Sequence, residues 1–197
     1  MTQLIGLTGG IATGKSTVSN ILAQAGLPIV DADKIAWKVE GPGMPTTQAI
    51  AAHFGPQVLL ADGSLNRPWL GHLVFNDATK LAELNAITRM PIQQAILTAI
   101  VAAGKKAPRA IILDVPLLFE GGWDHICDQV IVVSAPPAVV LQRLMARNHL
   151  DEAAAQARID SQLPLTTKAQ RADVVIDNGQ NVDKTRTAVL KWLKTIN

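Results

Sequence analysis

A glycine-rich segment near the start of the sequence holds the residue types with the clearest chemistry. Gly9 is followed by four other residues and then by Gly14, Lys15 and Ser16, which is the phosphate-loop spacing G-x-x-x-x-G-K-[ST]. Glycines let successive backbone N–H groups turn inward and form a concave anion site. The lysine can bridge the β- and γ-phosphates of a nucleotide, and the serine hydroxyl can ligate Mg²⁺. The segment therefore predicts a binding site for a nucleoside triphosphate.

The flanking residues distinguish this site from a glycine-rich turn that contains a lysine by coincidence. An apolar run of strand type covers residues 4–7, and apolar residues recur at helical spacing between Val18 and Ala25. A helix that begins near Lys15 points its unpaired N–H groups and the positive end of its dipole at a bound phosphate. The residues expected to contact the nucleotide are Gly10, Ile11, Ala12, Thr13, Gly14, Lys15, Ser16 and Thr17.

Carboxylates follow two further apolar runs of strand type. Asp31 and Asp33 come after residues 28–30, and Asp114 closes residues 110–113. Ligands of open parallel sheets bind beyond the carboxyl ends of the strands. Two aspartates at i and i+2 in extended chain share one face, so one could accept a proton from an attacking hydroxyl while the other orients it or holds metal-bound water. The alternative is that either one caps the following helix. Asp114 is expected near Mg²⁺.

Two arginines one helical turn apart form a third candidate group. Arg143 and Arg147 lie on a helix that Pro136 and Pro137 begin, after a predicted strand at residues 130–133. On a mobile lid they could neutralise the charge that develops during phosphoryl transfer. The alternative is a solvent-facing basic stripe. Asp151 is expected to cap a further helix, which carries Arg158 and ends at Pro164.

The elements that must position these residues alternate between strand and helix. The predicted strands lie at residues 4–7, 28–30, 110–114, 130–133 and 174–177. This alternation is typical of a doubly wound α/β fold with a five-stranded parallel sheet. We expect a single domain, 1–197, whose parts are a core (1–34, 90–140 and 171–197), a helical insertion (35–89) and a lid (141–170).

The expected insertion shows helical spacing only, and another helix, marked by Ile92, Ile96 and Ile100, is expected after it. The insertion is too long for a simple crossover connection. Thr46 or Thr47 is expected to cap its first long helix. Arg67 and Arg89 could meet an acidic substrate there, and Trp37, Trp69 and Trp123 are expected to serve packing.

Composition bounds the remaining possibilities. The 197 residues are 48% hydrophobic and 17% charged, which suits one good-sized core. The net charge of +2 comes without a run of like charge, so nothing favours nucleic acid or a membrane surface as partner. The single Cys127 fits a reducing compartment and is expected to be a small buried residue. With no apolar stretch near about 18 residues and no signal peptide, we expect a soluble, cytoplasmic monomer.

With these residues in order, the chain resembles the dephospho-coenzyme A kinase family nearly end to end. The phosphate loop is generic, but the pair Asp31 and Asp33 followed by Pro-Leu-Leu-Phe-Glu at residues 116–120 is specific. Further segments that match the family's order are residues 62–67, 74–75, 84–87, 172–173 and 176–178.

The resemblance implies a P-loop NTPase fold similar to nucleoside monophosphate kinases, with ATP and Mg²⁺ as cofactors and dephospho-CoA as the substrate. The reaction would phosphorylate the ribose 3′-hydroxyl of dephospho-CoA, the last step of coenzyme A synthesis. The catalytic residues would be Asp33 as base, Lys15 and Arg143. Arg147 would bind nucleotide, Ser16 and Asp114 would bind metal, and Asp33, Arg67, Leu117 and Glu120 would bind the acceptor.

The sequence also departs from the family's pattern. Ala12 stands where the family usually has Gly, and it fits if its φ angle is negative. Trp37 stands where Arg is common, Asn66 where Asp is usual, and Arg89-Met90 where His-Pro is frequent. Two other functions stay open: a kinase for another small acceptor, and a nucleotide-dependent switch. A GTPase switch would need an Asn-Lys-x-Asp motif, which this sequence lacks.

Overall fold

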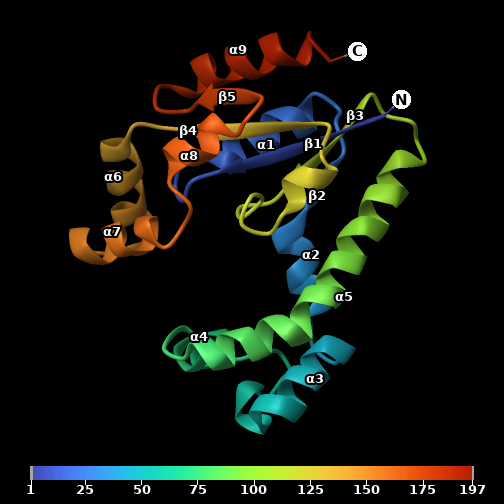
Figure 1. Cartoon of the computed structure of the whole chain (residues 1–197), viewed down its shortest axis with the longest axis vertical. Helices are drawn as coiled ribbons and strands as arrows, with labels where there is room; N and C mark the ends of the chain where they lie inside the picture. Colours follow the sequence, from blue (N-terminus) through green and yellow to red (C-terminus); the bar gives the residue numbers. More distant parts are fainter. Residues whose placement is uncertain (1, 197) are drawn as a thin grey trace. The chain divides into compact units, whose positions relative to one another are not determined.

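The computed structural model describes residues 2–196, which contain a five-stranded parallel sheet (Figure 1). The strand order is β2-β3-β1-β4-β5, and β1 pairs in parallel with both β3 and β4. The strands are β1 (Gln3–Gly9), β2 (Ile29–Asp31), β3 (Ala110–Asp114), β4 (Gln129–Ser134) and β5 (Val174–Asp177). The predicted α/β fold with five parallel strands is therefore confirmed.

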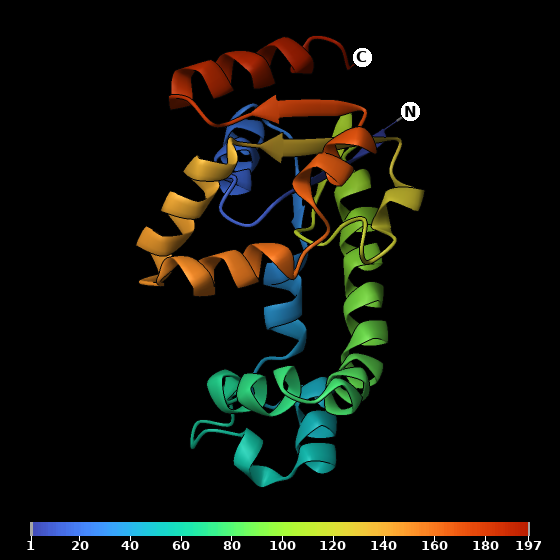
Figure 2. The same ribbon diagram turned by 60° about the vertical axis from the view of Figure 1, so that its left-hand side comes forward.

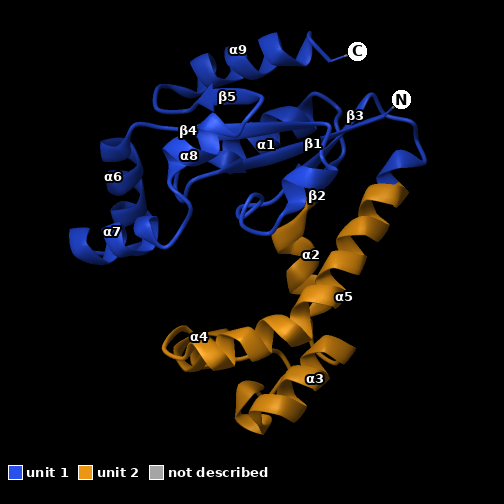
Figure 3. Ribbon diagram, viewed as in Figure 1, with its two compact units in different colours: residues 1–30, 103–197 blue, residues 31–102 orange. Residues whose placement is uncertain are grey.

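The chain divides into two compact units, residues 1–30 with 103–197 and residues 31–102 (Figure 3). The helices of the first unit are α1 (Lys15–Gln24), η2 (Trp123–Ile126), α6 (Pro137–Asn148), α7 (Glu152–Asp160), α8 (Leu165–Gln170) and α9 (Val182–Leu193). Those of the second unit are α2 (Ala32–Val39), α3 (Pro45–Phe54), η1 (Pro56–Val58), α4 (Arg67–Phe75) and α5 (Ala78–Gly104). The assignment of core, insertion and lid to particular functions stays a prediction.

The core of the first unit lies between the sheet and helices α1 and α9. Ile5, Ile112 and Ile131 of the sheet pack with Val18 of α1 and Val189 of α9, and all five are almost fully buried. Figures 1 and 2 show α9 running alongside β5. Because full burial of such a side chain stabilises the fold by about 1.5–3 kcal/mol, this layer holds β1 and the loop after it firmly in place.

The second unit has a hydrophobic core of its own. Ile50 of α3, Val58 of η1 and Leu70 of α4 are buried together, and Leu84 of α5 packs against them. Within the described residues its only extended pairing is a single antiparallel bridge between Leu59 and Leu65, around a turn at Asp62-Gly63. A helical body with its own core can carry binding residues independently of the sheet.

Several predicted boundaries of these helices were wrong. The two helices expected around Pro91 are one helix, α5, in which Pro91 is an interior residue. Helix α3 is capped by Met44 rather than by a threonine, and the Thr47 hydroxyl instead donates to the Gly41 carbonyl at 2.8 Å. Proline can then occupy the first turn of α3, where it loses no helical hydrogen bond. Helix α8 was not predicted, because its six residues show too little periodicity.

Helix α5 is the one helix of residues 2–196 that is long and apolar enough to cross a membrane. Its most apolar window has a mean hydropathy of 1.2, and 11% of that window is buried. No apolar stretch near about 18 residues was expected from the sequence, and charged residues such as Glu83 and Arg89 do interrupt the apolar residues of α5. One such helix is weak support for membrane insertion.

Candidate active site

The phosphate loop connects β1 to α1 and is braced by its own side chains. The Thr13 hydroxyl donates to the Gly10 carbonyl at 2.8 Å, and Thr13 is fully buried. Gly14 caps α1 with a φ of 87°, a conformation that glycine adopts without strain. A Cβ atom at Gly14 would also collide with the Asn178 side chain. The loop therefore requires glycine at this position for two separate reasons.

Asn178, the residue after β5, stabilises the phosphate loop through a side-chain hydrogen bond. Its Nδ2 atom donates to the Thr13 carbonyl at 2.8 Å, and its Oδ1 atom accepts from the Thr185 hydroxyl at 2.8 Å. Asn178 is 5% exposed, so these bonds are sheltered from water. From the sequence, Asn178 was placed in a tight turn and in a segment that matches the family, but was given no contact with the phosphate loop. Its contact with the phosphate loop joins residues far apart in the sequence, which no local pattern reveals.

Ala12 departs from the conformation expected of it. Its φ angle is 58°, in the left-handed region, so the condition of a negative φ is not met. A Cβ atom in this region costs about 1–2 kcal/mol. The surrounding hydrogen bonds hold the loop in this strained shape, which is common at functional sites.

Lys15 and Asp114 meet at the carboxyl end of the sheet. The Lys15 ammonium forms an ion pair with Asp114 Oδ1, and Asp114 is 4% exposed. The register of β1 and β3 places Leu7 opposite Asp114, so both strands deliver their ends to the same place. The predicted strand-end carboxylate therefore lies beside the loop lysine. Ser16, the residue after Lys15 in α1, is exposed, and its hydroxyl oxygen is a second possible metal ligand besides the Asp114 carboxylate.

This donor set suits Mg²⁺ better than a metal that needs a cage of side chains. No group of three or more His, Cys, Asp or Glu residues that could hold a metal occurs within residues 2–196. Mg²⁺ commonly takes one or two protein oxygens and completes its shell with phosphates and water. The Ser16 hydroxyl and the Asp114 carboxylate match that requirement.

The two aspartates after β2 have different structural roles. Asp31 is the N-cap of α2: its Oδ1 atom accepts from the Lys34 N–H at 3.0 Å. The capping alternative is thus confirmed for Asp31. Asp33 is exposed and lies in the first turn of α2, so the expectation that both aspartates share one face of an extended chain was wrong. The reason is that the helix begins immediately after Asp31.

Arg67 of the second unit is held by two neighbours. Its Nη1 atom lies 2.8 Å from Glu40 Oε2, and its guanidinium carbon lies 3.9 Å from the centre of the Trp37 ring. Trp37 itself is 62% exposed, so the expectation that it serves core packing was wrong. Arg89, the other arginine considered for an acidic substrate, is exposed on α5.

The two arginines of α6 occupy different surroundings. Arg143 lines a hollow of about 340 Å³ together with Gly14, Thr17 and Gln180. Arg147, one turn farther along, is exposed, and its Nε atom donates to the side chain of the neighbouring Asn148. Arg143 therefore lies at the edge of the phosphate loop. The predicted start of α6 at Pro136 and Pro137 and the predicted cap at Asp151 are confirmed, but α7 ends at Asp160 rather than at Pro164.

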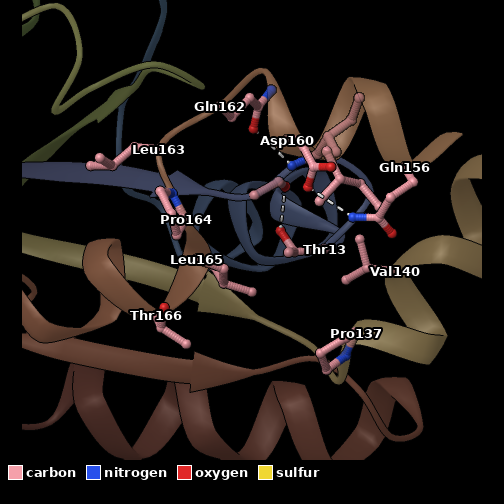
Figure 4. A pocket seen from close by; sticks show the side chains of 13 residues that line it. Thr13, Pro137, Val140, Gln156, Asp160, Gln162, Leu163, Pro164, Leu165 and Thr166 are labelled. Atoms are coloured by element: carbon pink, nitrogen blue, oxygen red, sulfur yellow. Dashed lines mark hydrogen bonds between the residues drawn. The ribbon is translucent and has the colours of Figure 1, made fainter. Parts of the chain in front are cut away.

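A second hollow, of about 350 Å³, lies between the phosphate loop and the segment that joins α7 to α8 (Figure 4). Gln162 of that segment points at the loop, and its Oε1 atom accepts from the Ile11 N–H at 3.1 Å. A backbone donor of the anion site is thus occupied by a side chain of the expected lid. The sequence interpretation did not identify Gln162.

The loop at residues 116–120 is tied to the same segment by charge. Glu120 Oε1 lies 2.8 Å from the Lys168 ammonium and accepts from the Leu163 N–H at 3.1 Å. Burial alone raises the pKa of Glu120, but the hydrogen bond and positive charge of Lys168 outweigh it, so the pKa lies below its usual value. Lys168 was missed, because a single lysine on a short helix normally indicates surface. Leu117, expected to bind the acceptor, is 46% exposed.

Cys127 has no role as a nucleophile in this arrangement. Burial, followed by the charges of Asp124 and Asp128, raises the pKa of its thiol to about 12. A thiol with such a pKa is protonated at neutral pH and unreactive. Cys127 is half-buried, and its Sγ atom contacts the Trp123 carbonyl at 3.3 Å.

Together the parallel sheet, the glycine-rich loop that opens α1, the Lys15–Asp114 pair and the separate helical unit define a P-loop kinase. Comparison with known proteins gives the particular family. The family model described as dephospho-CoA kinase matches residues 3–184. The chain belongs to the dephospho-CoA kinase family.

Curated relatives agree with this assignment over their full length. The dephospho-CoA kinase of Lactiplantibacillus plantarum is 76% identical over 196 residues, which cover 100% of this chain and 99% of that protein. The dephospho-CoA kinase of Listeria monocytogenes is 44% identical over 194 residues, which cover 98% of this chain and 97% of that protein. The chain is thus a kinase that uses ATP to phosphorylate the ribose 3′-hydroxyl of dephospho-CoA, the final step of coenzyme A biosynthesis.

Solved structures share the fold. TT1252 from Thermus thermophilus superposes with a TM-score of 0.87 at 29% identity, covering 98% of this chain and 97% of that one. The dephospho-CoA kinase from Campylobacter jejuni superposes with a TM-score of 0.76 at 31% identity, covering 100% of this chain and 98% of that one. A shikimate kinase from Acinetobacter baumannii superposes with a TM-score of 0.54 at 18% identity, covering 100% of this chain and 93% of that one. At so low an identity, the similarity shows the fold alone.

Proposed function

We propose that the first unit of the chain holds Mg²⁺-ATP and positions its γ-phosphoryl group for direct transfer. The observation that carries this proposal is the ion pair of Lys15 with the buried Asp114 at the mouth of the phosphate loop. The Lys15 ammonium binds the β- and γ-phosphates, and backbone N–H groups of residues 10–17 surround them. Ser16 and Asp114 would hold Mg²⁺, which when bound supplies positive charge to the phosphate oxygens.

Arg143 has the position to neutralise charge on the nucleotide. It shares its hollow with Gly14 and Thr17 of the phosphate loop and with Gln180 after β5. A guanidinium plane and a side-chain amide beside the loop also suit the adenine base, which stacks on planar groups and pairs with amides. We assign the adenosine of ATP to this hollow. Arg147, the second arginine of the expected lid, is our further candidate for nucleotide binding.

Asp33 is our candidate for the base that accepts the proton of the acceptor hydroxyl. It is exposed in the first turn of α2, where the positive end of the helix dipole lies close to its carboxylate. An ionised carboxylate orients a hydroxyl by accepting its proton in a hydrogen bond. We further assign Arg67, Leu117 and Glu120 to acceptor binding, on the family resemblance.

We also propose that the protein is a soluble, cytoplasmic monomer that binds neither nucleic acid nor membrane. The near balance of 18 basic and 16 acidic residues supports this proposal, as does the absence of any run of like charge in the sequence. Size-exclusion chromatography with light scattering would give the mass, which the proposal puts at one chain of 21.0 kDa.

A coupled ADP-release assay tests the whole proposal. The protein is incubated with ATP and either Mg²⁺ or EDTA, and with dephospho-CoA, adenosine, AMP or no acceptor. We expect rapid ADP release only with Mg²⁺ and dephospho-CoA together, with CoA as the product. Equal rates with and without dephospho-CoA would instead indicate a nucleotide switch, and a higher rate with another acceptor would indicate a different kinase.

A further inference from the structure

An exposed indole next to the candidate base is not used by the mechanism above. Trp37 is 62% exposed, although a tryptophan ring is among the side chains with most to gain from burial. It lies on α2, in the same compact unit as Asp33 and Arg67. Because Trp37 shares α2 with the candidate base, its open ring face could contact a substrate bound at that base.

Arg67 contacts one face of the Trp37 ring and holds the ring in one orientation. The Arg67 guanidinium lies 3.9 Å from the ring centre, and Arg67 is itself fixed by the ion pair with Glu40 at 2.8 Å. The backbone of Arg67 is also fixed, since it is the first residue of α4 and Asn66 caps that helix by accepting from the Trp69 N–H. The Trp37 indole is therefore a rigid platform backed by a cation, with most of its surface open to solvent.

The platform lies at a defined distance from the candidate base. Asp33 and Trp37 are four residues apart on α2, so they share one face of the helix and are separated by about 6 Å along its axis. In dephospho-CoA, the reacting 3′-hydroxyl and the adenine are attached to the same ribose ring. A hydroxyl placed at Asp33 therefore brings the adenine within reach of Trp37.

The chemistry of the platform favours the purine over the other parts of the acceptor. The Arg67 charge is already balanced by Glu40, whose side chain is only 13% exposed, so the cluster is a weak site for a pyrophosphate. The pantetheine arm is flexible and has no ring, whereas an indole face stacks well on any base.

We propose that Trp37 is a specificity-determining residue that binds the adenine of dephospho-CoA by stacking. This inference rests on the proposed role of Asp33. It assigns the exposed face of the indole to the acceptor's base, and it assigns the Arg67–Glu40 pair to positioning of the ring. Loss of a base–aromatic stack corresponds to about a tenfold or greater weakening of binding.

The kinetic test compares Trp37→Ala and Trp37→Phe with the control Val101→Ala. Val101 is 66% exposed in the same unit but lies on α5 rather than on α2, so it matches Trp37 in exposure on a different helix. We expect Trp37→Ala to raise KM for dephospho-CoA at least about tenfold while KM for ATP stays unchanged. Trp37→Phe keeps a ring and should stay within about threefold of wild type, as should Val101→Ala.

A fluorescence titration identifies the part of the acceptor that touches the ring. With a non-hydrolysable ATP analogue filling the nucleotide site, dephospho-CoA should quench the emission of wild type and Val101→Ala, and quench Trp37→Phe much less. The fragment 4′-phosphopantetheine should leave the emission unchanged.

Three results would overturn the inference: an unchanged KM for dephospho-CoA in Trp37→Ala, a raised KM for ATP alone, or quenching by 4′-phosphopantetheine that depends on Trp37. Failure of the proposed function has a different signature. In that case the wild-type protein itself would fail to turn over dephospho-CoA, and circular dichroism melting curves would separate both cases from misfolding.

Discussion

The Lys168 ammonium is completely buried and lies 2.8 Å from Glu120 Oε1, while the carbonyl oxygens of Pro116 and Gly9 lie 3.4 and 3.5 Å from it. One cation thus joins the α8 helix, the loop after β3 and the first glycine of the phosphate loop. A buried lysine is stable only when its charge is paired and its hydrogens are bonded. This residue holds the phosphate loop in place although it lies far from it in sequence.

Replacement of Lys168 by methionine should destabilise the protein strongly. The change leaves Glu120 without its cation and two carbonyl groups without a donor, which we expect to lower the free energy of unfolding by about 3 kcal/mol. Urea unfolding followed by circular dichroism measures this. Thr166→Ala, an exposed change on the same helix, is the control and should alter stability by less than about 0.5 kcal/mol. Equal stabilities would show that the ion pair contributes nothing.

The Glu120 carboxylate should make stability depend on pH in the acid range. Its pKa in the folded protein lies below the ordinary value of 4.5, so its contribution is present above that value and is lost as pH falls through the lower folded value. Glu120→Gln removes this contribution. We therefore expect the stability difference between wild type and Glu120→Gln to be constant near neutral pH and to shrink below about pH 4.5. Urea midpoints at several pH values test this, and a difference that grew on acidification would contradict it.

Replacement of Lys15 by alanine should affect the transition state more than the folded protein. It removes a charge aimed at the transferred phosphoryl group, and we expect kcat/KM to fall at least about 100-fold, or about 3 kcal/mol. The loss also leaves buried Asp114 without its partner, so the melting temperature is measured in parallel. The double variant Lys15→Ala with Asp114→Asn is compared by melting temperature alone, because Asp114 is also a proposed Mg²⁺ ligand, and it should recover the stability that Lys15→Ala loses through the unpaired carboxylate. A kcat/KM near wild type would exclude Lys15 from phosphate binding.

Asp33→Asn should reduce kcat strongly and leave ATP binding nearly intact, because asparagine fills the same space but accepts no proton. Asp31→Asn is the matched comparison, since asparagine caps a helix about as well as aspartate does. We expect its kcat to fall much less than that of Asp33→Asn. Steady-state kinetics with isothermal titration of an ATP analogue measures both. Wild-type turnover in Asp33→Asn would disprove its role as the base.

Ala12→Gly should relieve strain in the phosphate loop. Glycine removes the penalty of a Cβ atom at a φ of 58°, although it also gains freedom in the unfolded chain. The net effect should be a stabilisation of up to about 1 kcal/mol, seen as a melting temperature higher by about 2–4 °C. Ala12→Val, with a branched side chain at the same φ, should do the reverse. Identical melting curves for all three proteins would contradict this account.

The comparison of sequence and structure separates local from distant causes. The strand at residues 110–114 and the cap at Asp151 were predicted at their observed positions, because apolar runs and caps depend on neighbouring residues. The phosphate loop was likewise readable, since its spacing reflects its own backbone geometry. The positive φ of Ala12 was not, because some of the hydrogen bonds that hold the loop come from distant residues, Gln162 and Asn178.

The missed residues share another property. Lys168 and Gln162 contact the phosphate loop from more than 150 positions away in the chain, at separations of 159 and 151 residues. Trp37 was expected to serve packing, since aromatic residues usually pack, but it is 62% exposed and contacts Arg67 on one face. Tertiary contacts decided each of these cases, and a single sequence does not encode them as a pattern.

The hydrogen bond from Asn178 to the Thr13 carbonyl also has a consequence for the order of folding. The loop is made in the first part of the chain, but β3 and β4, the neighbours of β1, and the Asn178 support all come more than 100 residues later, the last at a separation of 165. During synthesis on the ribosome, the nucleotide site therefore stays unassembled until β5 has emerged. Closure of so long a chain segment is slow, and it ties the arrival of binding competence to completion of the sheet.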